Sequence, residues 1–165
     1  MPLISLKDLP QFVVNRQRFL GLDIGTKTVG LAISDGEYKV ASPLETLKRS
    51  KFRDDAQHLL AIVDHRNVGG FIAGLPISLD GTEGPRCQSV RQFAENLLAI
   101  RNLPFSFWDE RMSTAAMQRF LIGEVDMTRK RRSEVIDKLA ATYILQGALD
   151  FLGQNNDQIM RDRHE

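Results

Sequence analysis

The sequence predicts an α/β domain with a mixed sheet that helices flank. Three observations favour this class: hairpin-like strand runs come first, strand and helix patterns then alternate, and two helical patterns close the chain. Hairpins give antiparallel strand pairs, whereas parallel pairs need a crossover that is usually a helix. This order of patterns therefore indicates a sheet that contains both kinds of pair.

The first three predicted strands form consecutive hairpins. The short apolar run at residues 18–24 (RFLGLDI) is typical of a buried strand, and residues 29–34 form a second. Asp35-Gly36 is a strong hairpin-turn pattern because both residues tolerate positive φ. We expect a third strand around residues 38–41, so the amino-terminal part should hold three antiparallel strands.

Strand and helix patterns alternate after this point. Apolar residues recur at helical spacing over residues 51–65, and residues 68–75 (VGGFIAGL) return to a strand pattern. A second helix carries the apolar residues between 90 and 98 on one face. Residues 103–108 then complete a predicted sheet of five strands.

Two helices are expected to close the domain. Ser113 is a candidate N-cap for a helix that reaches about residue 122, and Ser133 is a candidate N-cap for a helix over residues 134–152.

Length and composition fit one globular domain. The chain has 165 residues, of which 42% are hydrophobic and 26% charged, close to the average of soluble domains. We expect one domain over residues 18–152, preceded by an extension of residues 1–17 and followed by a flexible tail of residues 153–165.

A cytoplasmic location without a membrane segment is expected. Cys87 is the single cysteine of the sequence, so it cannot form an intramolecular disulfide, and a reducing compartment is the natural interpretation. The first residues lack the apolar run of a signal peptide, and no segment approaches the roughly 18 apolar residues of a membrane span.

Binding to nucleic acid would depend on local basic clusters, because the formal net charge is only +1. Two clusters stand out in the sequence: Lys48, Arg49, Lys51 and Arg53, and the run Arg129, Lys130, Arg131 and Arg132. The second run is expected on a loop between helices, where it would either contact phosphates or simply be solvated.

Asp23 is the most informative residue, because it is a lone carboxylate in an apolar strand followed by a glycine-rich turn. A buried ionised Asp is costly unless it is paired or coordinates a metal. The structural alternative is that amides of the following turn satisfy it.

Two further acidic positions complete the pattern. Asp109 and Glu110 follow a predicted strand, where α/β sheets place their ligands. Asp137 interrupts the apolar face of the last helix. The structural alternatives are an ion pair of the 109–110 acids with Arg111 and a favourable helix-dipole position for Asp137.

Three carboxylates from two strands and a helix can converge on hard divalent cations, which take oxygen ligands. Two such ions about 4 Å apart stabilise the attacking and leaving oxygens of a phosphodiester displacement. The sequence therefore predicts a metal-dependent nuclease site.

Several segments resemble the YqgF/RuvX family. They are residues 21–35 (GLDIGTKTVGLAISD), 74–76 (GLP), 80–84 (DGTEG), 109–114 (DERMST) and 136–145 (IDKLAATYIL). The resemblance extends over about residues 18–152. It implies a compact RNase H-like fold akin to that of the Holliday junction resolvase RuvC.

The resemblance also implies an activity, a metal and partners. Members are proposed to mature the 5′ end of precursor 16S ribosomal RNA, and an alternative role is resolution of branched DNA. The acidic positions would be Asp23, one acid of the 109–110 pair and Asp137, and we favour Glu110 over Asp109. They would hold Mg²⁺ or Mn²⁺, as two ions. Ribosomal precursor particles are expected partners, and cutting both strands of a junction would require a homodimer.

Family loop motifs place five more residues near the substrate. These are Lys27, Gly74, Pro76, Glu83 and Arg111. The resemblance makes Lys27 and Arg111 phosphate contacts, and Glu83 a further ligand or a loop-ordering residue. Thr28 departs from the family pattern, because many members carry a basic residue there.

Two other functions fit part of the sequence. Residues 23–26 (DIGT) also resemble the first phosphate loop of actin-like and sugar kinase ATPases, but those enzymes close a cleft between two domains and this chain has room for one. A non-catalytic nucleic-acid-binding accessory factor would keep the same motifs without cleavage.

Overall fold

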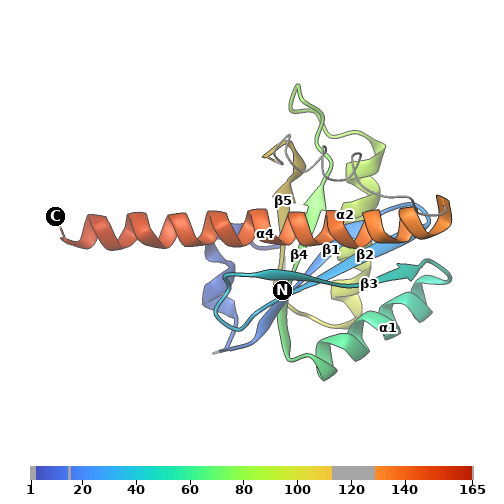
Figure 1. Cartoon of the computed structure of the whole chain (residues 1–165), viewed down its shortest axis with the longest axis horizontal. Coiled ribbons are helices and arrows are strands. Elements are labelled where there is room, and N and C mark those ends of the chain that lie inside the picture. Colours follow the sequence, from blue (N-terminus) through green and yellow to red (C-terminus); the bar gives the residue numbers. More distant parts are fainter. Residues whose placement is uncertain (1–2, 15, 113–128, 165) are drawn as a thin grey trace.

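The computed structural model describes residues 3–14, 16–112 and 129–164, and it describes side chains in the last range from residue 136 onward. Five strands form one sheet in the order β3-β2-β1-β4-β5 (Figure 1). The strands are β1 (Arg18–Ile24), β2 (Thr28–Ser34), β3 (Ala41–Lys48), β4 (Val68–Leu75) and β5 (Phe105–Asp109). Strands β1, β2 and β3 pair antiparallel, and β4 pairs parallel with β1 and β5. The predicted mixed five-stranded sheet is confirmed.

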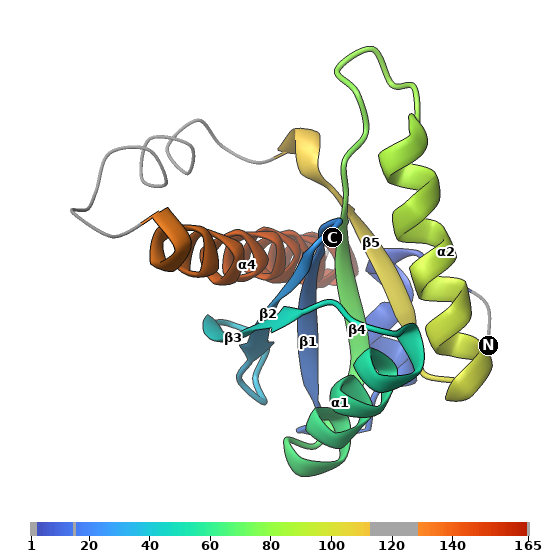
Figure 2. The same ribbon diagram turned by 90° about the vertical axis from the view of Figure 1, so that its right-hand side faces the viewer.

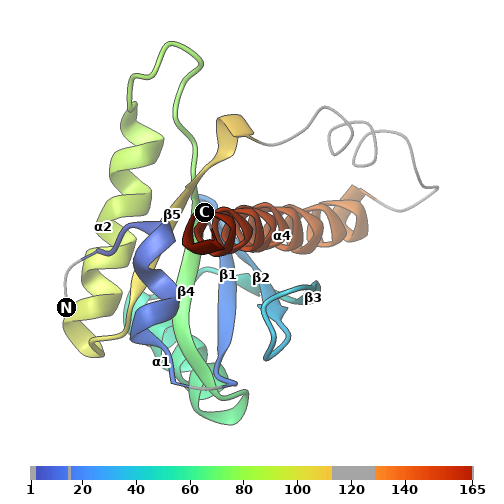
Figure 3. The ribbon, with the colours of Figure 1, turned by 90° about the vertical axis from the view of Figure 1, so that its left-hand side faces the viewer.

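Helices cover both faces of the sheet. They are η1 (Leu6–Phe12), α1 (Phe52–His65), α2 (Pro85–Ile100), η2 (Glu110–Met112) and α4 (Arg129–His164). Figures 2 and 3 show α1 and α2 on one face and α4 on the other. Two apolar cores result, one under α1 and α2 and one under α4 and η1. Among the described helices, none combines the length and hydropathy that a membrane span requires.

The third strand lies later in the chain than predicted. The carboxylate of Asp35 accepts hydrogen bonds from the backbone amides of Lys39, at 2.8 Å, and Val40, at 3.0 Å. Tyr38 has a positive φ of 62°. Because this side chain organises a loop after the Asp35-Gly36 turn, β3 begins at Ala41 and the predicted strand at residues 38–41 is wrong.

The two segments outside the predicted domain contain helical elements. Leu6 and Leu9 of η1 are buried, and the Ile4 amide donates to the Phe105 carbonyl at 2.8 Å, which fixes this segment to β5. Helix α4 continues to His164 and projects past the sheet (Figure 1). No proline or turn motif interrupts residues 153–164, so the polar sequence continues as an exposed helix. The helix predicted from Ser113 lies outside the described residues.

Helix α4 packs directly on the sheet backbone because glycines lie beneath it. The strand glycines are Gly21 of β1, Gly30 of β2 and Gly74 of β4. A Cβ atom at position 30 would lie 2.1 Å from the backbone oxygen of Asp137, and one at position 21 would lie 2.8 Å from the Cβ atom of Leu145. Any larger residue would push α4 away from β1 and β2.

We therefore expect Gly30→Ala to destabilise the fold by about 1–3 kcal/mol or more, because the new methyl group overlaps the α4 backbone. The control is Gly153→Ala on the exposed part of α4, where an added Cβ has no neighbour within 4 Å. That change should stabilise the helix by roughly 0.5–1 kcal/mol. Urea unfolding of both variants measures the difference, and equal stability of Gly30→Ala and wild type would contradict this packing.

Candidate active site

Asp23 lies near the carboxyl end of β1, on the face that α4 covers. Its neighbours Leu22 and Ile24 point into the α1–α2 core, so strand alternation turns Asp23 the other way. Across the antiparallel ladder Asp23 is opposite Gly30, the residue on which α4 rests. The half-buried carboxylate therefore lies at the junction of β1, β2 and α4.

Asp137 comes to this junction from α4. Its backbone lies over Gly30, and its side chain accepts a hydrogen bond from the hydroxyl of Thr28, Oγ1 to Oδ2, at 2.7 Å. Thr28 lies two residues before Gly30 on β2 and shares its face. The threonine that departs from the family pattern thus orients one of the predicted acidic residues.

Glu110 directly follows β5, as the first residue of η2. Trp108 of β5 packs in the α4 core, and the Glu110 side chain lies on the same face of the sheet. Its Oε1 atom lies 2.5 Å from the position that a Cβ atom of Gly74 would occupy. Gly74 follows Ala73, the β4 partner of Leu22, so Glu110 reaches across bare β4 backbone toward Asp23.

Asp109 points away from this cluster and forms an ion pair. The guanidinium of Arg111 donates to it from Nη2 to Oδ2 at 2.6 Å and from Nε to Oδ1 at 3.1 Å. The pairing holds the pKa of Asp109 below its usual range. The ion pair with Arg111 that the sequence offered as an alternative role therefore applies to Asp109. Glu110 is the acid that shares a face with Asp23.

The charges of the three acids act on one another through Asp23. Burial, with a further contribution from the charge of Asp137, raises the pKa of Asp23 to about 6. Burial, followed by the charge of Asp23, raises the pKa of Glu110 to about 7. The positive charge of Arg86 lowers both pKa values and only partly compensates. The site therefore concentrates negative charge that its own cations do not neutralise.

The charges of the three acids influence one another, but their side chains are not arranged around a common metal position in this structure. In the described part of the chain, no group of three or more His, Cys, Asp or Glu side chains is arranged to hold a metal ion. Asp23 interacts with Glu110 on one side and with Asp137 on the other. The metal-ligand role of the three residues stays a prediction.

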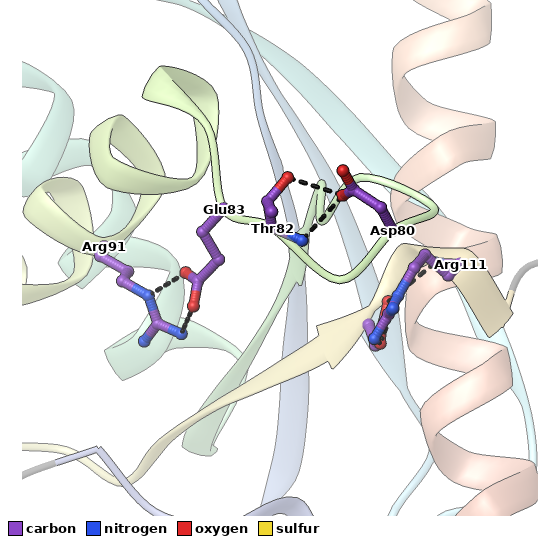
Figure 4. Close-up of polar contacts among 6 residues, drawn as sticks. Asp80, Thr82, Glu83, Arg91 and Arg111 are labelled. Carbon is purple, nitrogen blue, oxygen red and sulfur yellow. Dashed lines mark hydrogen bonds and ion pairs between the residues drawn. The ribbon is translucent and has the colours of Figure 1, made fainter.

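Side-chain contacts order the loop between β4 and α2 (Figure 4). Asp80 accepts hydrogen bonds from the amide of Thr82 at 2.9 Å and from its hydroxyl at 2.6 Å. Glu83 forms a two-point ion pair with Arg91 of α2, with the shorter contact at 2.6 Å. Arg111 lies beside the loop, where its charge contributes to lowering the pKa of Asp80. Glu83 thus has a loop-ordering contact.

The other predicted substrate residues occupy different surroundings. Gly74 is buried beneath Glu110 and α4, and Pro76 is half-buried where the loop begins. Lys27 is exposed in the turn between β1 and β2, and Arg111 is held by Asp109. Of these residues, Lys27 has the most freely accessible charge. None of these placements tests a substrate contact.

Two arginines at the end of β1 were missed as site residues. Arg49 donates from Nη1 to the carbonyl of Gly25 at 2.7 Å, and Arg86 donates from Nη2 to the carbonyl of Ile24 at 3.3 Å. Arg49 also lies over the ring of Phe93, 5.4 Å from its centre. The sequence showed Arg49 only as part of a basic cluster, and no pattern pointed to Arg86, because its proximity to Asp23 arises from the packing of α2.

Two solved structures of Holliday junction resolvases share this fold. T. thermophilus RuvC in complex with a Holliday junction substrate matches with a TM-score of 0.51 and 15% identity, over 83% of this chain and 96% of that chain. The yeast mitochondrial Holliday junction resolvase Ydc2 matches with a TM-score of 0.54 and 12% identity, over 92% of this chain and 86% of that chain. The fold is therefore of the RNase H-like, RuvC type, as predicted.

The sequence narrows this class to one family. The family model described as "RuvX: Holliday junction resolvase" matches residues 17–151, and the chain belongs to this family. A Rhodospirillum rubrum relative named "Putative pre-16S rRNA nuclease" is 52% identical over 158 residues, 96% of this chain and 98% of the relative. A Paramagnetospirillum magneticum relative of the same name is 54% identical over 150 residues, 91% of this chain and 96% of the relative.

The raised pKa values predict how stability depends on pH without divalent ions. The ordinary values are 3.8 for Asp23 and 4.5 for Glu110, so between about pH 4 and 7 the folded state binds more protons than the unfolded state. The free energy of unfolding should therefore fall as the pH rises through this window. Asp23→Asn removes one of the repelling charges, so it should stabilise the metal-free protein by roughly 1–3 kcal/mol at pH 8.

Urea unfolding in EDTA at pH 5 and pH 8 measures this effect. The gain from Asp23→Asn should shrink at pH 5, where the Asp23 carboxyl is largely protonated in the folded protein. The control is Glu37→Gln, an exposed acid in the hairpin loop. An equal gain at both pH values would mean that the charge of Asp23 does not destabilise the fold.

Proposed function

We propose that this protein is a metal-dependent endonuclease that hydrolyses phosphodiester bonds in processing the 5′ end of precursor 16S ribosomal RNA. The observation that carries the proposal is the position of Asp23, Glu110 and Asp137 on one face of an RNase H-like sheet, where Asp137 lies over Gly30, the ladder partner of Asp23, and Glu110 lies over Gly74. Membership of the RuvX family and relatives named for this activity support it.

The donor set fits a hard divalent cation, Mg²⁺ or Mn²⁺. All three side chains offer carboxylate oxygens, the ligands such ions prefer, and two of them carry pKa values raised by burial and mutual repulsion. We infer that Asp23, Glu110 and Asp137 hold the metal, as two ions. Bound there, the metal would supply a water of lowered pKa and would neutralise negative charge that develops at the phosphate.

The surrounding side chains hold and orient the groups of the site. Thr28 keeps the Asp137 carboxylate turned toward the sheet by a 2.7 Å hydrogen bond. Lys27 is an exposed cation directly before β2, in the turn that the hydrogen bond from the Gly25 amide to the Thr28 carbonyl closes, and a phosphate could approach it there. Arg111, held by Asp109 beside the β4–α2 loop, would bind a second phosphate.

The substrate and setting follow from the proposed role. Pre-16S ribosomal RNA within ribosomal precursor particles would be the partner, and the protein would act in the cytoplasm. Branched DNA is the second candidate substrate, because the family model and the RuvC complex both name Holliday junctions. Resolution of a junction would require two active sites, and therefore a homodimer.

Metal binding can be tested without measuring cleavage. Mg²⁺ should raise the thermal unfolding temperature of the wild-type protein, because the cation relieves repulsion among the three carboxylates and binds only the folded state. Asp23→Asn and Glu110→Gln should lose most of this increase, whereas Glu37→Gln should keep it. An equal Mg²⁺ response in all four proteins would remove the assignment of the metal site.

Cleavage assays test the activity itself. With Mg²⁺, the wild-type protein should cut an RNA that spans the 5′ end of precursor 16S ribosomal RNA. Asp23→Asn should lower the cleavage rate by at least about 10²–10³-fold, because it removes a carboxylate ligand of the metal that would stabilise charge at the phosphate. The unfolding temperature of the variant shows that the fold is intact, and Glu37→Gln is the control for a lost acid.

The same proteins should be assayed on a four-way DNA junction. Faster cleavage of the junction than of the RNA would favour the resolvase role. Binding that survives chelation, without cleavage of either substrate in Mg²⁺ or Mn²⁺, would favour an accessory factor, and nucleotide hydrolysis would favour an ATPase.

A further inference from the structure

Arg86 brings a guanidinium group to the acidic cluster, although it lies outside the sequence motifs that predicted the site. It lies in the first turn of α2, after Pro85, and its Nη2 atom donates to the carbonyl of Ile24 at 3.3 Å. Ile24 directly follows Asp23 and ends β1. The first turn of α2 contains no acidic residue, so the partial positive charge of the helix end adds to that of Arg86.

The charge of Arg86 acts on two of the three acids. Its charge lowers the pKa of Asp23 and also that of Glu110, which come from different strands. Yet Arg86 forms no ion pair of 4.0 Å or less among the described residues. Its hydrogen bond to the Ile24 carbonyl places the guanidinium next to the end of β1 that carries Asp23, where no carboxylate of the described residues pairs with it.

Two other arginines around the site are held by ion pairs, Arg91 by Glu83 and Arg111 by Asp109. Arg49 is half-buried, because its guanidinium lies over the ring of Phe93 and donates to the carbonyl of Gly25. Arg86 is exposed, and the single hydrogen bond described for it uses one of its five N–H donors. The remaining donors form a planar fork that suits two oxygens of a phosphate.

We propose that Arg86 binds the phosphodiester group of the nucleic acid substrate at the Asp23–Glu110–Asp137 cluster, and so is a further catalytic residue. This inference rests on the proposed nuclease function and adds a substrate contact to it. A phosphate that approaches three carboxylates is repelled by them, and a cation held beside Asp23 and Glu110 offsets that repulsion where negative charge increases during the reaction.

Cleavage kinetics test the contact. The substrate is the precursor 16S 5′ RNA with Mg²⁺, and the proteins are wild type, Arg86→Gln, Arg86→Lys and the charge-matched control Arg66→Gln, an exposed arginine at the end of α1. Arg86→Gln should lower kcat/KM by about 10²–10³-fold. Arg86→Lys should recover only part of it, because an ammonium group lacks the planar fork. Arg66→Gln should resemble wild type.

A binding assay separates a phosphate contact from a bracing role toward Ile24. In EDTA, fluorescence anisotropy with the same labelled RNA should show that Arg86→Gln reduces the slope of log affinity against log salt by about one, the loss expected for one phosphate contact. A bracing role would instead lower the unfolding temperature and leave the slope unchanged. Free guanidinium ion at millimolar concentration should restore cleavage by Arg86→Ala.

The outcomes distinguish this inference from the proposed function. Suppose that the wild-type protein cleaves the RNA, and that Arg86→Gln has the same kcat/KM and the same salt slope as the wild type. This result would overturn the Arg86 contact alone. A wild-type protein that never cleaves, but whose salt slope depends on Arg86, would overturn the nuclease and keep the phosphate contact. A wild-type protein that binds neither the RNA nor a DNA junction would overturn both.

Discussion

The close contact of α4 with the sheet backbone is the constraint on which the rest of the site depends. Gly30 leaves no side chain between β2 and α4, so the backbone of Asp137 lies directly against the strand. Asp23 is the ladder partner of Gly30, and the helix contact therefore fixes the spacing of the two carboxylates. Gly74 has the same effect for Glu110 on the other side of Asp23. Two glycine-dependent approaches thus place Asp137 and Glu110 on the face that carries Asp23.

This arrangement is unfavourable for the isolated fold and useful for binding cations and phosphates. Half-buried carboxylates that repel one another shift their equilibrium toward the protonated form, as the raised pKa values of Asp23 and Glu110 show. A fold that retains such a cluster must recover the free energy from its apolar layers, which here lie on both faces of the sheet. Perturbed carboxylates gathered on one face are typical of a functional site.

The basic residues around the cluster divide into those held internally and those open to a ligand. Ion pairs hold Arg91 and Arg111, and Arg49 packs on Phe93 and binds the Gly25 carbonyl; these contacts shape the β1–β2 turn and the β4–α2 loop. Lys27 and Arg86 are exposed and form no ion pair among the described residues. A modest net charge of +1 is compatible with nucleic acid binding, because these two cations lie at the ends of the segments that carry the site.

The sequence by itself determined the alternation of strands and helices and the apolar surroundings of Asp23, because these depend on local periodicity of two or 3.6 residues. It misplaced the third strand, since the Asp35 side chain captures loop amides in a way that turn propensity does not encode. Only the tertiary structure decided that Thr28 orients Asp137, that α4 extends to His164, and that Arg86 contacts the end of β1 next to Asp23. These contacts join residues up to 109 positions apart, and such distances are set by how helices pack on a sheet and not by any pattern along the chain.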